Sequence, residues 1–196
     1  MLELLLDTLD RDVTFAALKL PLDVRPIEGE RMAFHQSYLK PQKYNRRFDE
    51  KFTFVPASSY TLTNTEVARN LAKRFSELIP SISEIQAVMF LRIPAPDADD
   101  GMLPPHVDYG RMCAVNVYLK CSGETTQFYT WDTNTRNVVP SSHFVAEPMS
   151  CWLLDTSIPH AVRMKKGCER FLLTFSFSET SFNAVKAACA EAGLLL

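Results

Sequence analysis

The sequence has no surplus of charge of either sign, because 21 lysine and arginine residues stand against 23 aspartate and glutamate residues, for a formal net charge of -2. This balance disfavours a protein that binds nucleic acid or an anionic membrane through a basic surface. The sequence also lacks an apolar run of the roughly 20 residues that a transmembrane helix needs. Its first residues, MLELLLDTLDRD, are acidic where an export signal is basic, so we expect a cytoplasmic protein that contacts no membrane.

Cysteine pairs of the type C-x-x-C are absent too. The five cysteines are odd in number and widely scattered, which argues against a disulfide framework and a zinc-thiolate site, so we expect reduced, mostly buried thiols. No G-x-S-x-G motif surrounds Ser157, so the nucleophile turn of a serine hydrolase is missing. The acidic run DADDG at 97–101 lacks the ligand spacing of a calcium loop and predicts a solvated turn.

The chain is long enough for one sizeable core. It has 196 residues, of which 46% are hydrophobic, and no repeat or linker divides it, so we expect a single domain over 1–196. Residues 1–84 are expected to form short helical and loop elements that support this core. In this part Thr63 and Glu66 match a capping box, and apolar residues at helical spacing continue to Pro80, which predicts a helix.

The pattern changes in the second half of the chain, where short apolar runs rich in Val, Phe, Tyr and Trp alternate with turn residues. Five runs predict strands, and they read IQAVMFLRI, MCAVNVYLK, TQFYTW, SCWLLD and RFLLTFSF. Such strands are typical of a sandwich or barrel, so we expect a β core over 85–178. A helix is expected over 180–193, capped by Ser178 or Thr180 and ended by Gly193. The fold class is therefore mainly β with flanking helices.

A histidine and an aspartate, His106 and Asp108, stand two residues apart in the stretch LPPHVDYGRMCAVNVYLK. Residues two apart in a strand point the same way, so a nitrogen and a carboxylate oxygen can meet at one point. With one more histidine they would occupy one face of an octahedral Fe(II) and leave the other positions for a co-substrate and oxygen. His160, where a run ends in a turn, is the candidate third ligand. His143 lies in a predicted polar loop, and His35 has no partner at ligand spacing.

An arginine, Arg170, opens the last apolar run, ten residues after His160. It offers either a charge at the solvent end of a strand or a rigid fork for a carboxylate in the same cavity as the metal. If Asp108 faces inward, Asn116 and Tyr118 share its strand face. The Asn116 amide is costly to bury without partners, so it either meets a keto-acid carboxylate or is satisfied by the backbone.

The order and spacing of His106, Asp108, His160 and Arg170 resemble the Fe(II)- and 2-oxoglutarate-dependent oxygenase superfamily, whose fold is a double-stranded β-helix, a distorted jelly roll. The stretches PPHVDYGRMCAVNVYL, ETTQFY and LLDTSIPHAV are similar to short bacterial and phage oxygenases related to aspartyl/asparaginyl β-hydroxylases. The resemblance implies that the first three residues bind iron and that Arg170 holds the far carboxylate of 2-oxoglutarate. It also implies hydroxylation rather than halogenation, because halogenating relatives replace the carboxylate ligand.

One position departs from the superfamily pattern. Leu172 stands where many relatives have a serine or threonine that supports the far carboxylate of 2-oxoglutarate. The candidate replacements are Thr174, on the strand face of Arg170, and the hydroxyl groups of Tyr118 and Tyr129.

The resemblance implies a dioxygenase that uses Fe(II), 2-oxoglutarate and O2 and releases succinate and CO2. The substrate classes that it implies are an amino acid, a peptidyl or carrier-bound residue, and a small natural-product intermediate. The alternative is a non-redox jelly-roll module that binds a metal or another ligand, in which His143 would complete a closed site. Arg92 and Arg111 are expected to be surface charges at strand ends, with the alternative that they bind an anionic group of the substrate.

Overall fold

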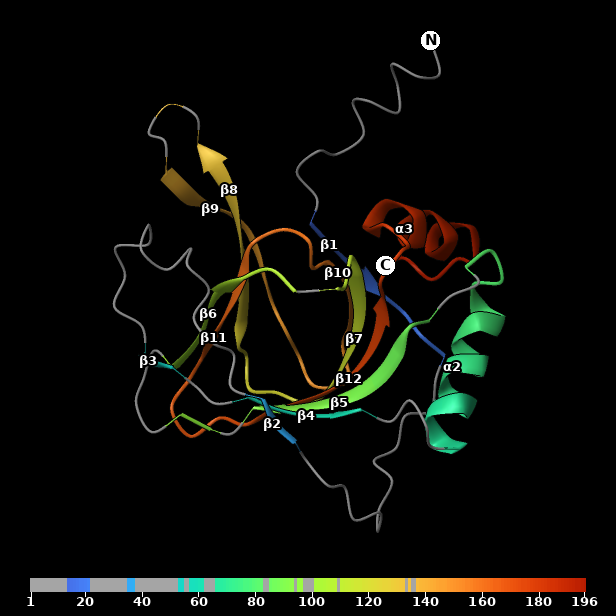
Figure 1. Cartoon of the computed structure of the whole chain (residues 1–196), viewed down its shortest axis with the longest axis horizontal. Coiled ribbons are helices and arrows are strands. Elements are labelled where there is room, and N and C mark those ends of the chain that lie inside the picture. The colour runs from blue at the N-terminus through green and yellow to red at the C-terminus, as the bar shows by residue number, and fades with distance from the viewer. Residues whose placement is uncertain are drawn as a thin grey trace.

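The computed structural model has two facing sheets, and the helices α2 and α3 lie against the outer side of the larger one (Figure 1). The predicted cap Thr63 and most of the predicted turn at 97–101 lie outside the described residues. The structure describes residues 14–21, 35–37, 53–54, 57–61, 66–82, 85–93, 95–96, 101–108, 110–132, 134 and 137–196.

Within these residues the larger sheet has seven strands in the order β1-β10-β7-β12-β5-β4-β2. Their bounds are β1 Phe15–Leu18, β2 His35–Ser37, β4 Ala57–Thr61, β5 Ala87–Ile93, β7 Cys113–Lys120, β10 Cys151–Asp155 and β12 Arg170–Phe177. The smaller sheet, counted over the same part of the chain, has five strands in the order β3-β6-β11-β8-β9. Their bounds are β3 Thr53–Phe54, β6 Gly101–His106, β8 Thr125–Asp132, β9 Asn137–Val145 and β11 His160–Met164.

The path of the chain from β5 to β12 defines the fold. Strands β5, β7, β10 and β12 are neighbours in the larger sheet, and β6, β8, β9 and β11 are neighbours in the smaller one, so the chain passes repeatedly between the sheets. All of the pairings within these two sets are antiparallel. Two four-stranded sheets joined in this way form a jelly roll. The predicted double-stranded β-helix with flanking helices is therefore confirmed.

The two faces of β7 separate the outer core from the interior between the sheets. Three alternate residues of this strand pack in the apolar cluster that includes the helices, namely Cys113, Val115 and Val117. Tyr118 packs instead with Leu172 in a second cluster, which draws residues from both sheets. Because side chains alternate along a strand, Ala114 and Asn116 share the inner face of Tyr118, as the sequence predicted.

Helix α2 spans Glu66–Leu78 and confirms the predicted helix before Pro80. Its buried residues Leu71 and Phe75 follow the predicted helical spacing, and the Phe75 ring stacks on Phe175 of β12 with a centroid distance of 4.5 Å. This contact anchors the helix to the larger sheet.

Helix α3 spans Phe182–Glu191, and its cap differs from the prediction. The hydroxyl of Ser181 accepts a hydrogen bond from the backbone N–H of Ala184, so Ser181 is the N-cap in place of Ser178 or Thr180. A capping oxygen must reach the free N–H groups of the first turn, and the residue directly before that turn does so. Gly193, with φ of +68°, follows the end of the helix as predicted.

The sequence patterns did not predict three strands of the core, β6, β9 and β11. Strand β9 falls in the segment that was predicted to be a polar loop, and it contains Pro140. Strand β6 contains Pro104 and Pro105. A proline cannot donate to a sheet and is tolerated at sheet edges. Among the described strands β9 is an edge strand, and β6 has only the two-residue β3 on its outer side. Their positions explain why these two strands contain prolines and were not predicted.

The cysteines are mostly buried, as predicted: all five are free, and all except Cys168 are buried. Within the described part of the chain, no helix combines the length and the apolar character needed to span a bilayer.

Replacing Phe175 by alanine is expected to lower the free energy of unfolding by about 3–5 kcal/mol. The ring has 0% of its surface exposed and stacks on Phe75, so truncation leaves a cavity between β12 and α2. Urea denaturation measures the loss. The matched control is Met112→Ala at an exposed side chain, which is expected to cost less than about 0.5 kcal/mol. A loss of under about 1 kcal/mol for Phe175→Ala would contradict this packing of α2.

Candidate metal and co-substrate site

The structure brings His106, Asp108 and His160 together. His106 is the last residue of β6 and His160 is the first of β11, and the two face each other in the antiparallel register. One potential ligand atom of each residue lies within 4.8 Å of those of the other two. Nε2 of His106 is 3.6 Å from Oδ1 of Asp108, and Nε2 of His160 is 4.0 Å from Oδ2. Two imidazole nitrogens and one carboxylate therefore converge.

Asp108 reaches this cluster by a route that differs from the prediction. It lies two residues beyond the end of β6, in the connection to β7, so the alternation of a strand does not orient it. Its backbone N–H donates a hydrogen bond of 3.0 Å to the carbonyl oxygen of Thr156. The hydroxyl of Thr156 donates in turn to the carbonyl oxygen of Arg111 at 3.0 Å. These bonds tie the loop of Asp108 to the turn that precedes His160.

His160 presents Nε2 to the cluster because its other ring nitrogen is engaged. Nδ1 lies 2.9 Å from the carbonyl oxygen of Ile158, and an N–H at this position donates to that oxygen and leaves the lone pair on Nε2. Burial, with a further contribution from His106, lowers the pKa of His160 to about 4. The ring is therefore a neutral imidazole at neutral pH, the form that binds metal ions.

Asp108 carries its negative charge in this setting. Burial raises the pKa of its carboxyl group, but the guanidinium of Arg111, with smaller contributions from His160 and His106, outweighs burial and holds the pKa below its usual value. Nε of Arg111 donates to Oδ2 of Asp108 at 2.9 Å, and Nη2 donates to the same oxygen. An ionised carboxylate is the form that ligates a metal.

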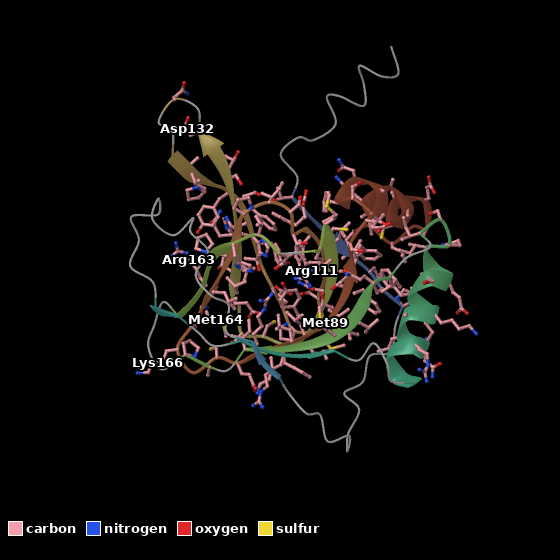
Figure 2. The ribbon with its side chains drawn as sticks, in the orientation of Figure 1. Met89, Arg111, Asp132, Arg163, Met164 and Lys166 are labelled. Carbon is pink, nitrogen blue, oxygen red and sulfur yellow. The ribbon has the colours of Figure 1, made fainter. Side chains whose placement is uncertain are left out.

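Arg111 lies in the interior, so the prediction of a surface charge is wrong for this residue. Figure 2 labels it near the middle of the view, and its side chain is 19% exposed. Its Nη1 lies 3.4 Å from Oγ1 of Thr174 and 3.3 Å from Oγ of Ser176, two hydroxyls of β12. Gly110, with φ of +73°, precedes Arg111 and adopts a left-handed backbone that favours glycine. The other arginine, Arg92, is a surface charge as predicted, because it is 52% exposed and pairs with Glu169.

Arg170 is buried, although it is the first residue of β12, and only 4% of its surface is exposed. Its Nη2 donates a hydrogen bond of 3.0 Å to the hydroxyl of Tyr118, and its guanidinium carbon is 5.1 Å from the centre of the same ring. Of the two alternatives left open by the sequence, a charge at the solvent end of the strand is therefore excluded. Arg170 is a cation held between the sheets.

A buried carboxylate that the sequence reading missed, Glu124, faces Arg170. Its Oε1 lies 3.4 Å from Nε of Arg170, and its Oε2 accepts a hydrogen bond of 3.1 Å from the backbone N–H of Ser122. Over the described residues, neither Nε of Arg170 nor Oε1 of Glu124 makes a hydrogen bond. A glutamate in the turn CSGE reads as a solvated charge. One signal could have predicted its burial. Glu124 lies two and four residues before Thr126 and Phe128, which point inward on β8, so strand alternation places it on the same face.

The remaining candidate co-substrate residues line the same interior. Asn116 and Thr174 lie opposite each other on β7 and β12, and both are buried. Oδ1 of Asn116 has no hydrogen-bond partner in the part of the chain that the structure describes, so the backbone does not satisfy this oxygen. The hydroxyl of Thr174 contacts Arg111. Leu172, between Arg170 and Thr174 on the inner face of β12, is fully buried in an apolar cluster.

Three other residues considered from the sequence lie apart from this site. His143 is exposed on β9 and is not a member of the cluster. Tyr129 packs with Ala161 in a separate apolar cluster. His35 lies in β2, and its side chain is outside the described part of the structure.

Comparison with known proteins gives distant structural likenesses. No protein-family model matches the chain, and no curated protein matches it in sequence. An oxidoreductase of the 2OG-Fe(II) oxygenase family from Burkholderia pseudomallei is 13% identical, over 77% of this chain and 75% of that one, with a TM-score of 0.48. A Pseudomonas putida prolyl-4-hydroxylase is 14% identical, over 66% and 72%, with a TM-score of 0.43. The vicilin of Solanum melongena is 13% identical, over 67% and 30%, with a TM-score of 0.40.

The strand order and the geometry of the cluster, rather than these distant likenesses, define the class of the protein. It is a double-stranded β-helix that carries two histidines and one aspartate within ligand distance of one another. Both features are those that the resemblance to the Fe(II)- and 2-oxoglutarate-dependent oxygenase superfamily implies.

Proposed function

We propose that the chain is an Fe(II)- and 2-oxoglutarate-dependent dioxygenase that hydroxylates an unactivated C–H bond with release of succinate and CO2. The supporting observation is that His106, Asp108 and His160 converge within ligand reach of one another, while Arg170 is a buried cation with a buried tyrosine hydroxyl beside it. The substrate that we propose is an amino acid, a peptidyl or carrier-bound residue, or a small natural-product intermediate. The balanced charge of the chain itself fits a substrate other than nucleic acid.

The donor set fits Fe(II). Two neutral imidazoles and one carboxylate are the three ligands of non-haem iron oxygenases, and they leave coordination positions open. His160 keeps its Nε2 lone pair for the metal, because Nδ1 is bonded to Ile158. When bound, the iron supplies the oxidation of the substrate by O2 and the keto acid. The residues of the chain hold the metal and orient the reactants.

The polar groups of the interior have the chemistry that a dicarboxylic keto acid needs. Arg170 and the Tyr118 hydroxyl would hold its far carboxylate, because both are buried and already in contact. Asn116 adds a buried amide with an unused hydrogen-bonding atom, and rotation of the amide can turn its NH2 group to a carboxylate. Glu124 opposes this attraction, since its Oε1 lies beside Nε of Arg170. The positive field at Arg170 is therefore partly neutralised before any anion binds.

Large side chains keep water away from this interior. Tyr118, Phe128 and Leu172 each have 0% of their surface exposed and belong to one apolar cluster. The Phe128 ring lies 5.8 Å from the His160 ring, centre to centre. Exclusion of water strengthens the interactions of Arg170 and of the iron ligands, and it protects reactive species from side reactions.

A closed metal site in a non-redox binding module is the alternative. Such a tetrahedral site needs a fourth protein ligand. Over the residues that the structure describes, the cluster has three members, and the exposed His143 is not one of them. A cluster of three ligands, together with a buried arginine on β12, favours the oxygenase.

An anaerobic titration of the purified protein with Fe(II) and 2-oxoglutarate tests the proposal. We expect a visible charge-transfer band from bidentate chelation of the keto acid, which requires open positions on the metal, and succinate formation after admission of O2. The variant His106→Ala is expected to show neither, whereas His143→Ala, at an exposed histidine, is expected to show both. Absence of both signals in the unmodified protein would refute the assignment, and iron binding without the band would indicate a closed site.

A further inference from the structure

The guanidinium group of Arg111 bridges the Asp108 carboxylate and the inner face of β12. Nε and Nη2 both donate to one carboxylate oxygen, Oδ2 of Asp108. Nη1 points to the hydroxyls of Thr174 and Ser176. All three nitrogens of the group are thus engaged, and two of the contacts come from a strand that carries none of the three candidate ligands. Arg111 is therefore bound to β12 through these hydroxyls and holds the carboxylate of Asp108 at the same time.

Asp108 needs such support because of where it lies. Its backbone is fixed by the hydrogen bond to Thr156, but it stands two residues outside β6, so the alternation of a strand does not orient its side chain. An aspartate carboxylate can rotate to offer one oxygen or both. A planar guanidinium forms short, charge-assisted hydrogen bonds in a fixed geometry, so it can select one orientation.

The two oxygens of Asp108 have different surroundings. Oδ2 receives both donors of Arg111 and lies 4.0 Å from Nε2 of His160, whereas Oδ1 lies 3.6 Å from Nε2 of His106. We propose that Arg111 is a positioning residue that makes Asp108 a one-oxygen ligand, with Oδ2 held by the guanidinium and Oδ1 left for the metal. This inference rests on the proposed function. It goes beyond it by giving a role to a residue outside the ligand set.

The number of open coordination positions depends on this choice. Two histidines and one carboxylate oxygen leave three of six octahedral positions, enough for a keto acid that binds through two atoms and for one further ligand. A carboxylate that binds through both oxygens leaves only two. By holding Oδ2, Arg111 would keep the third position free when a metal is bound and would tune the affinity of the site, as partners of ligating carboxylates do.

Cobalt(II) binding to the metal-depleted protein tests the role of Arg111 without reliance on turnover. Arg111→Gln is expected to weaken Co(II) binding by about 10- to 100-fold and to change the visible Co(II) spectrum, because the carboxylate is then free to bind through both oxygens. Arg111→Lys keeps the charge but loses the fork, so we expect a smaller loss of affinity with the same spectral change. The matched control is Arg74→Gln, at an exposed arginine on α2, with unchanged affinity and spectrum.

Thermal melting of each metal-free variant accompanies the titration, and the lysine variant provides a second test if the glutamine variant is unstable. Wild-type affinity and spectrum in both Arg111 variants would overturn the inference and leave the proposed function intact. Failure of the unmodified protein to bind Co(II) or Fe(II) would overturn both. A purely structural salt bridge would lower the melting temperature without changing the spectrum, and that result also counts against the inference.

Discussion

Replacing His160 by alanine is expected to abolish Fe(II) binding and 2-oxoglutarate turnover together. The ring is 5% exposed, neutral, and oriented by the bond between Nδ1 and Ile158, so its Nε2 has no substitute in the cluster of three described residues. The loss of metal affinity should exceed the roughly 10- to 100-fold effect of losing a supporting partner outside the ligand set. Metal affinity is measured by titration of the metal-depleted protein, and turnover is measured as succinate formed.

The same truncation leaves a cavity beside Phe128, so the variant must be shown to fold. Circular dichroism and the melting temperature of the metal-free protein separate unfolding from loss of a ligand. His160→Gln fills more of the space and should fold better while it still fails to bind iron. A well-folded variant that keeps the charge-transfer band of bound 2-oxoglutarate would remove His160 from the ligand set.

Removal of the buried charge at Arg170 is expected to weaken 2-oxoglutarate binding by about 30-fold or more, because truncation of one partner of a buried charged pair costs about 2–5 kcal/mol. The single variant Arg170→Gln would leave Glu124 buried without its cation and destabilise the fold by about 3–5 kcal/mol. The double variant Glu124→Gln, Arg170→Gln removes both charges and is the cleaner test. Its dissociation constant for 2-oxoglutarate is read from the anaerobic charge-transfer band.

The single variant Glu124→Gln tests the effect of the Glu124 charge on 2-oxoglutarate binding. It leaves Arg170 in place and removes the anion at 3.4 Å, so 2-oxoglutarate should bind several-fold more tightly than in the unmodified protein. Iron affinity should be unchanged in both variants, since neither residue belongs to the metal cluster. Equal 2-oxoglutarate affinity in the double variant and the unmodified protein would exclude Arg170 as the residue that binds the co-substrate.

Much of the architecture could be predicted from the local spacing of apolar residues. The helical spacing of Leu71 and Phe75 marked α2, and the alternation of Asn116 and Tyr118 with apolar neighbours marked the inner face of β7. These signals work because a helix or a strand repeats its contacts at a fixed period along the chain. The period failed at β6 and β9, where prolines are tolerated near the edges of the described sheet.

Two residues of the interior could not be predicted. Arg111 follows a glycine in a connection, and Glu124 stands in a turn, where charged residues are usually solvated. Glu124 is instead drawn inward by Arg170, far along the chain, and Arg111 by the hydroxyls of β12 together with Asp108, which is three residues away. The contacts with distant residues, which place both side chains in the interior, have no signal in a local window.

The sequence by itself determined the chemical groups of the candidate site and their order along the chain: a histidine, an aspartate, a second histidine and an arginine. Only the tertiary structure decided that His106 and His160 face each other and that Arg170 is buried against Glu124. It also decided that Arg111 donates two hydrogen bonds to a single oxygen of Asp108. The physical reason is that strand register and burial are set by pairing between distant segments, whereas periodicity reports only on neighbours along the chain.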